Sequence, residues 1–97
     1  QSLGTNGYVK FNTGLIIQWG VSSRVSMDRN YTLTFPITFP NSCLRAFVSI
    51  TNSSTTDDDI FARVVRYNAS SITVRAEGTA NAGQSGTRYI EYLVIGF

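Results

Sequence analysis

Residues 7–20 read Gly-Tyr-Val-Lys-Phe-Asn-Thr-Gly-Leu-Ile-Ile-Gln-Trp-Gly, and the expected fold follows from this stretch. Two apolar runs, residues 8–11 and 15–19, each have the length and composition of a short strand. Between them, Asn12, Thr13 and Gly14 suit a turn of about three residues, with glycine where a left-handed backbone is easiest. The stretch therefore predicts a β-hairpin.

The second strand of this hairpin carries apolar residues on both faces. Leu15, Ile17 and Trp19 point to one side and Ile16 and Gln18 to the other, because side chains alternate along a strand. A strand that is covered on both sides needs two partners. One of these partners could be another subunit.

The composition indicates one domain with part of its surface covered. The chain has 97 residues, of which 42% are hydrophobic and only 14% are charged. Soluble proteins average roughly 25% charged residues, and a small domain has much surface for its volume. We therefore expect self-association, or cover by a neighbouring segment.

Charge and residue usage argue against several classes of protein. The net charge is +2, and the basic residues are scattered rather than gathered in the patch typical of nucleic-acid binding. There is no histidine, the commonest general base and metal ligand. Cys43 is the only cysteine, so no intrachain disulfide can form and we expect it to pack as a small hydrophobic residue. No apolar run approaches the ~20 residues of a membrane helix, so no membrane insertion is expected.

The rest of the chain is a series of strand patterns separated by turns. We interpret residues 1–6 as a linker or the end of an upstream element, and residues 7–97 as one domain. The predicted class is all-β, a small antiparallel β-sandwich of six to seven strands. The expected strands are residues 8–11, 15–19, 31–35, 43–51, 60–67, 71–76 and 88–97.

Alternation within these strands predicts which residues face the core. Residues 23–30, by contrast, have the composition of an exposed loop. The residues expected to point inward are Leu44, Ala46, Val48, Ile50, Ile72, Val74 and Ala76. In the strand at 60–67, Ile60, Ala62 and Val64 are expected to share one face.

Residues 35–40 read Phe-Pro-Ile-Thr-Phe-Pro and predict a corner. Pro36 and Pro40 cannot donate hydrogen bonds to a sheet, so the strand before them must lie at an edge or leave the sheet here. We expect Phe35 and Phe39 to fill part of the core.

Two long loops are expected, a polar one at 52–59 and a glycine-rich one at 77–87, and long loops in compact domains often carry function. Asp57, Asp58 and Asp59 form the only acidic run. Calcium favours clustered carboxylates, but three consecutive residues in extended backbone alternate in direction and the EF-hand spacing is missing. We therefore predict a solvated loop, with no metal and no cofactor.

Catalysis finds little support in the sequence. Glu77 and Glu91 could form a glycosidase pair, which requires two carboxyl groups at a set separation, but nothing in the sequence places them together. The serines have no histidine partner and no Gly-x-Ser-x-Gly elbow, and Lys10 is the only lysine. The sequence predicts a protein that is not an enzyme.

Arginine and tyrosine recur together in the later strands. Sugar-binding sites use aromatic rings against the apolar face of a sugar, and arginine binds anionic groups bidentately. The alternative is that the tyrosines are packing pairs between strands. The residues concerned are Arg63, Arg66, Tyr67, Arg88, Tyr89 and Tyr92.

Residues 7–20 resemble the opening of the C-terminal tip domain of tailed-bacteriophage tail fibres. In that family an Asn-Gly-Tyr-x-Lys hairpin leads to Gly-Leu-Ile-x-Gln-Trp-Gly. The Phe-Pro-x-x-Phe-Pro step at 35–40 and the closing Ile95-Gly96-Phe97 are also similar. The likeness covers nearly the whole chain, although residues 43–86 match only in strand pattern.

The resemblance implies a homotrimeric fibre tip, part of the extracellular virion tail fibre, with a sandwich similar to that of H-type lectins. Such a tip adsorbs the virion to a bacterial surface receptor, often a lipopolysaccharide or capsular glycan. The expected partner is therefore a surface glycan or an outer-membrane receptor. Three copies around a fibre axis would bury the second face of the hairpin strand. The expected trimer interface is Ile16, Gln18, Trp19 and Phe97.

Receptor contacts are expected in the two loops and on nearby arginines and tyrosines. Two alternatives remain open: a non-catalytic structural cap that supports trimerisation, and a free-standing lectin of H-type architecture. The candidate ligand-binding residues are Asn52, Asp57, Asp58, Asp59, Arg63, Arg66, Tyr67, Arg88 and Tyr92.

Overall fold

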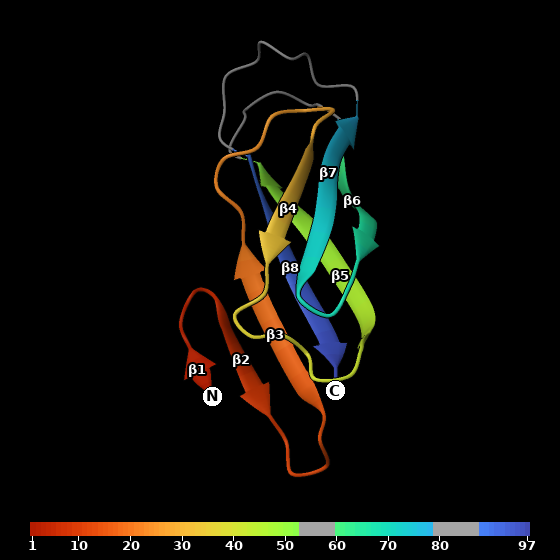
Figure 1. Ribbon diagram of the computed structural model, residues 1–97. Helices are drawn as coiled ribbons and strands as arrows, with labels where there is room; N and C mark the ends of the chain where they lie inside the picture. The colour runs from red at the N-terminus through yellow and green to blue at the C-terminus, as the bar shows by residue number, and fades with distance from the viewer. Residues whose placement is uncertain (53–59, 79–87) are drawn as a thin grey trace.

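Residues 1–52, 60–78 and 88–97 are described by a computed structural model, and their regular structure is entirely β-strand (Figure 1). No helix in this part of the chain is long and apolar enough to cross a membrane. The strands are β1 (Ser2–Leu3), β2 (Gly7–Lys10), β3 (Ile16–Val21), β4 (Asn30–Thr34), β5 (Cys43–Asn52), β6 (Ile60–Tyr67), β7 (Ser71–Gly78) and β8 (Arg88–Gly96).

The strands form two antiparallel sheets that pack face to face. One sheet has the order β1-β2-β3-β8-β5 and the other the order β4-β7-β6. Figure 1 shows the smaller sheet in front of the larger one. The predicted all-β sandwich is confirmed, and all seven expected strands are present. The additional strand is β1, which pairs with β2.

The core lies between the two sheets and comes mainly from their central strands. Every second residue of β8 is buried, and Ile90 and Val94 are fully enclosed. Ile72, Val74 and Ala76 of β7 face them and are also fully enclosed, as predicted. Each large aliphatic side chain buried in this way stabilises the fold by about 1.5–3 kcal/mol.

The predicted hairpin is confirmed as β2, a short turn and β3. Lys10 pairs with Ile16 at the end of the ladder, and Phe11 N–H donates to the Leu15 carbonyl at 2.8 Å. Gly14 has a φ of 95°, so the left-handed position of the turn is occupied by glycine, as its sequence position indicates.

The structure corrects the expected orientation of the hairpin's second strand. Ile16 and Gln18 are buried in the chain's own core, and Leu15 is exposed. Gln18 can be buried because both polar atoms of its amide are hydrogen-bonded: Nε2 donates to the Ile37 carbonyl at 2.9 Å, and Oε1 accepts from Ile37 N–H at 3.0 Å. Ile16 and Gln18 are therefore not available to a second subunit, and the free face of β3 carries Ile17 and Trp19.

The Phe-Pro corner is confirmed. β4 is an edge strand that ends at Thr34, and the chain leaves the sheet before Pro36. Phe35 and Phe39 are both buried and meet edge to face, with ring centroids 5.6 Å apart. Both prolines are exposed. This agrees with their lack of a backbone N–H that could donate to a neighbouring strand.

Two expectations about inward-facing residues were wrong. Residues 23–30 are not a fully exposed loop, because Val25 and Met27 are buried in the core. Hydrogen bonds from Val25 N–H to the Arg88 carbonyl and from Asp28 N–H to the Ala76 carbonyl hold this segment against the sandwich. Leu44 is 41% exposed because a β-bulge between Cys43 and Arg45 rotates it outward, whereas Cys43 is buried as predicted.

Residues 1–6, predicted as a linker or the end of an upstream element, are fastened to the larger sheet. Besides the pairing of β1, Trp19 Nε1 donates to the Gly4 carbonyl at 3.0 Å. The Asn6 side chain accepts from Val21 N–H, also at 3.0 Å. These contacts make the segment part of the sheet in the described chain.

Candidate functional site

Two of the candidate ligand-binding residues, Arg88 and Tyr92, lie inside the sandwich. The alternation of β8 that buries Ile90 also points these two side chains inward, and both are buried. The Tyr92 ring packs against Phe35 at a centroid distance of 5.6 Å. Burial raises the pKa of the Tyr92 phenol to about 12. Neither side chain is exposed enough to contact a receptor directly, which corrects the prediction for both.

Tyr67 also differs from its expected position. A β-bulge between Val64 and Arg66 shifts the register, so Arg66 pairs with Thr73 and Tyr67 pairs with Ile72. Tyr67 therefore turns away from the arginines of β6, and its hydroxyl donates to the Leu44 carbonyl of β5 at 3.3 Å. It links the edges of the two sheets.

Four further candidates cannot be placed. Asp57, Asp58 and Asp59 lie outside the described residues, and so does the side chain of Asn52. Within the described ranges, no group of three or more His, Cys, Asp or Glu side chains is arranged to hold a metal ion.

The remaining candidates, Arg63 and Arg66, lie on the outer face of the β4–β7–β6 sheet, here called the polar face. Asn30, Arg75 and Arg63 stand in one row across its three strands. Glu77 lies two residues beyond Arg75 and so points to the same side. Three separate strands therefore deliver polar side chains to one place.

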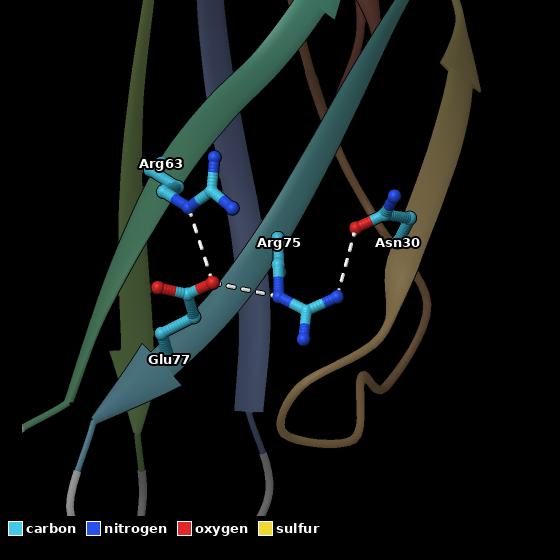
Figure 2. Close-up of polar contacts among 4 residues, drawn as sticks. All are labelled: Asn30, Arg63, Arg75 and Glu77. Carbon is cyan, nitrogen blue, oxygen red and sulfur yellow. Dashed lines mark hydrogen bonds and ion pairs between the residues drawn. The ribbon is translucent and has the colours of Figure 1, made fainter.

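These side chains form a connected network, shown in Figure 2. Glu77 Oε1 accepts from Arg63 Nε at 3.1 Å and from Arg75 Nε at 2.7 Å. Arg75 Nη1 donates onward to Asn30 Oδ1 at 3.1 Å. We call Arg63, Glu77 and Arg75 the Arg–Glu–Arg cluster. Its geometry holds three long side chains in defined positions on a sheet.

The electrostatics of the cluster keep Glu77 ionised. Partial desolvation raises the pKa of its carboxyl, but the hydrogen bonds and positive charges of Arg63 and Arg75 outweigh this effect and lower the pKa below its usual value. Two guanidinium charges and one carboxylate charge leave the cluster with one net positive charge. Because these side chains are partly exposed, the positive charge can interact with a ligand that approaches from solvent.

An exposed aromatic ring lies beside the cluster. Phe61 of β6 pairs with Glu77 across the strands and is 51% exposed. On the same face, the hydroxyls of Thr32 and Thr73 hydrogen-bond at 3.0 Å. An apolar ring next to donors and acceptors that are held in place is able to bind a molecule with one apolar and one polar side.

Phe61, Arg75 and Asn30 were not predicted as site residues. Glu77 was expected as a catalytic candidate and as the first residue of the receptor-contacting loop at 77–87, whereas β7 extends through it to Gly78. The proposed partner Glu91 lies on the outer face of the other sheet, where it accepts from Thr51 Oγ1 at 3.0 Å. The two carboxyl groups therefore face opposite sides of the sandwich and cannot act on one bond. Alternation alone could have placed Phe61, Arg75 and Glu77 outward, but only strand pairing brings them together.

The outer face of the five-stranded sheet carries a row of apolar side chains beside the polar pair Thr51 and Glu91, and we call this row the apolar face. Trp19, Leu93 and Phe47 form one row across β3, β8 and β5, and Ile17 pairs with Ile95 in the next. Phe47 is 54% exposed and Leu93 42%. Of the expected interface residues, Trp19 lies on this face, whereas Phe97 is exposed at the end of β8.

Comparison with protein families matches residues 10–97 to the family described as putative tail fiber protein gp53-like, C-terminal. The chain belongs to this family of tail-fibre C-terminal domains. The predicted family, and with it a location in the virion tail fibre, are confirmed.

Solved structures of pyocin tail fibres have the same fold. The N-truncated R1-type pyocin tail fiber is 27% identical with a TM-score of 0.76, over 99% of this chain and 83% of that chain. The N-truncated R2-type pyocin tail fiber is 27% identical with a TM-score of 0.82, over 99% of this chain and 36% of that one.

One curated relative is the uncharacterized protein MJ0347 of Methanocaldococcus jannaschii. It is 44% identical over 63 residues, which cover 63% of this chain and 42% of the relative. The matched segment thus spans less than half of that protein's length.

Proposed function

We propose that this domain is the receptor-binding part of a tail fibre and attaches the particle to a bacterial surface glycan through its polar face. The observation that carries the proposal is the exposed Phe61 ring beside the Arg–Glu–Arg cluster and Asn30. No catalytic step is required, and the separation of Glu77 from Glu91 on opposite sheets supports binding without catalysis.

The chemistry of the polar face suits a sugar. The apolar face of a pyranose ring can stack on Phe61, while its hydroxyl groups meet guanidinium, carboxylate and amide groups in the same plane. Because these groups are already hydrogen-bonded to one another, little side-chain entropy is lost when a ligand binds. A site on paired strands is also more rigid than a site on loops.

The position of the cluster supports a role in receptor contact. Glu77 lies next to Gly78, at the end of β7 that Figure 1 places at the top of the sandwich. Both termini lie toward the opposite end in the same view. A fibre segment preceding the N-terminus would approach from that end and leave the polar face accessible to a cell surface.

We further propose that three copies associate through the apolar outer face of the five-stranded sheet. The row of Trp19, Leu93 and Phe47 supports this, since a monomer gains nothing from exposing large apolar side chains next to one another. The proposal keeps Trp19 in the interface and replaces Ile16 and Gln18 with Ile17, Phe47 and Leu93. Three sites on one tip would raise the apparent affinity by avidity.

An array of bacterial surface polysaccharides, probed with the folded protein, tests the receptor proposal. We expect binding to at least one lipopolysaccharide or capsular glycan, and Phe61→Ala should weaken it by about tenfold, as loss of a central aromatic contact typically does. Phe11→Ala is the matched control, because Phe11 is 46% exposed in the hairpin turn, away from the polar face.

Two results would point to other functions. Undiminished glycan binding by Phe61→Ala would move the receptor site away from the polar face. An absence of binding to every glycan would favour a structural cap that ends the fibre and supports association through the apolar face.

A further inference from the structure

Both arginines of the Arg–Glu–Arg cluster contact the carboxylate through a single nitrogen. Each donates its Nε–H to the same oxygen, Glu77 Oε1, at 3.1 Å from Arg63 and 2.7 Å from Arg75. Arginine and carboxylate often pair through two parallel hydrogen bonds, which would occupy one whole edge of the guanidinium. Here Nε is the nitrogen of each arginine that pairs with Glu77, and the terminal nitrogens of Arg75 are directed away from the carboxylate (Figure 2).

The cluster therefore has more donors than acceptors. A guanidinium carries about five N–H groups and no acceptor. Among residues 1–52, 60–78 and 88–97, the two guanidiniums have only three bonds between them: two to Glu77 and one from Arg75 Nη1 to Asn30. The free donors are partly exposed, since the Arg63 side chain is 48% accessible.

An uncharged sugar satisfies these donors less completely than an anionic one. Its hydroxyl groups both donate and accept, whereas one of the two Glu77 oxygens already accepts from two arginines. A phosphate or carboxylate is made of acceptor oxygens and carries the charge that would neutralise the cluster's remaining positive charge. The exposed ring of Phe61 can pack against the apolar face of the sugar that bears the anion.

We infer that the polar face binds an anionic sugar, whose phosphate or carboxylate is held by the terminal nitrogens of Arg63 and Arg75. Glu77 is a positioning residue that orients the two guanidiniums through their Nε atoms and lowers their attraction for an anion. This inference rests on the proposed function, because it specifies the ligand of the same site.

The experiment compares sugars that differ at a single substituent. Glucose, glucose 6-phosphate and glucuronic acid are titrated into the folded protein, and binding is followed by the NMR signals of the Arg63 and Arg75 Nε–H groups. We expect either anionic sugar to bind about tenfold more tightly than glucose at low salt. The phosphate and carboxylate arms then show which anion is preferred.

Substitutions distinguish the role of the arginines, which attract the anion, from that of Glu77, which positions the arginines. Glu77→Gln keeps an acceptor oxygen for both Nε–H groups but removes the negative charge, so it should raise affinity for the anionic sugars about two- to fivefold. Arg75→Gln should lower anionic binding about tenfold. Lys10→Gln, which removes an exposed positive charge from β2 in the other sheet, is the control and should have no effect.

Several results would overturn the inference. Unshifted Arg63 and Arg75 signals with both anionic sugars, or weaker anionic binding by Glu77→Gln, would do so. Equal binding of glucose and its anionic derivatives would also overturn the inference. If, in that case, Phe61→Ala no longer bound the sugars, the proposed receptor site on the polar face would still be supported. Absence of binding to these sugars and to every surface glycan would remove both proposals.

Discussion

At the scale of single residues, one buried glutamine holds the corner between β4 and β5. Gln18 lies on β3 of the five-stranded sheet, and Ile37 lies in the segment that joins β4 to β5. Both polar atoms of the Gln18 side chain hydrogen-bond to the backbone of Ile37. Gln18→Leu would leave the Ile37 N–H and carbonyl without these partners, and should lower the free energy of unfolding by about 2 kcal/mol. Urea unfolding followed by circular dichroism measures this loss, and an unchanged midpoint would contradict it.

Tyr92 links stability to alkaline pH. Burial raises the pKa of its phenol to about 12 in the folded chain, above the value of about 10 for an exposed tyrosine. Below pH 10 both states keep the proton and the contribution to stability is complete. As the pH rises through about 12 the unfolded chain releases its proton first, so stability falls.

Replacing Tyr92 should therefore change how the protein responds to base. Tyr92→Phe should lose less stability than the wild type between pH 9 and 12, and denaturant unfolding at a series of pH values measures the difference. Tyr89→Phe, on the exposed side of β8, is the matched control. Identical pH profiles for Tyr92→Phe and the wild type would exclude this role.

The same strand shows why sequence alone could not choose the site residues. β8 alternates correctly, but both of its faces carry large apolar or aromatic residues, with Tyr92 and Val94 on one and Tyr89 and Leu93 on the other. Periodicity separates two faces without saying which one is covered. Arg88 and Tyr92 have the chemistry of a sugar site, but they lie on the covered face.

At the scale of elements, the end of β3 is hydrogen-bonded by the side chain of Asn6, beyond the point where β2 stops pairing with it. β2 pairs with β3 only as far as Trp19, and Val21 N–H is bonded instead to the Asn6 side chain at 3.0 Å. Asn6→Ala should lower stability by about 1 kcal/mol and increase hydrogen exchange at the Val21 amide. Equal exchange of this amide in both proteins would show that the bond contributes nothing.

β-Bulges explain the other errors in the predicted strands. In β5 the bulge turns Leu44 itself outward, and the residues that follow keep their predicted direction. In β6 the inserted residue reverses the direction of the side chains that follow it, including Tyr67. Nothing in the local composition marks either position. The strand boundaries, by contrast, follow from turn residues and alternation and were predicted closely, as for β6 at Ile60–Tyr67.

At the scale of the whole molecule, the two outer faces of the sandwich have different chemistry. The smaller sheet presents charged and hydroxyl groups, and the larger sheet presents an apolar row. Family resemblance and fold class could be predicted from residues 7–20 and 35–40. The candidate site could not, because Asn30, Phe61, Arg75 and Glu77 come together only through the pairing of β4, β7 and β6.

The apolar face predicts the oligomeric state. We expect light scattering to give a mass of three chains for the wild type, and a mass of one chain for Leu93→Asp, because a carboxylate in the middle of an apolar interface is costly to bury. Leu15→Asp, at an exposed position in the hairpin turn, should remain a trimer. A single-chain mass for the wild type would contradict the proposed association.

Receptor binding through the polar face is tested most directly by competition for adsorption. Excess purified wild-type protein is mixed with sensitive bacteria before addition of the particle that carries this fibre, and free particles are counted. We predict that wild type and Phe11→Ala block adsorption, whereas folded Phe61→Ala and Arg75→Gln do so weakly. Full blocking by the last two variants, or none by the wild type, would contradict receptor binding at the polar face.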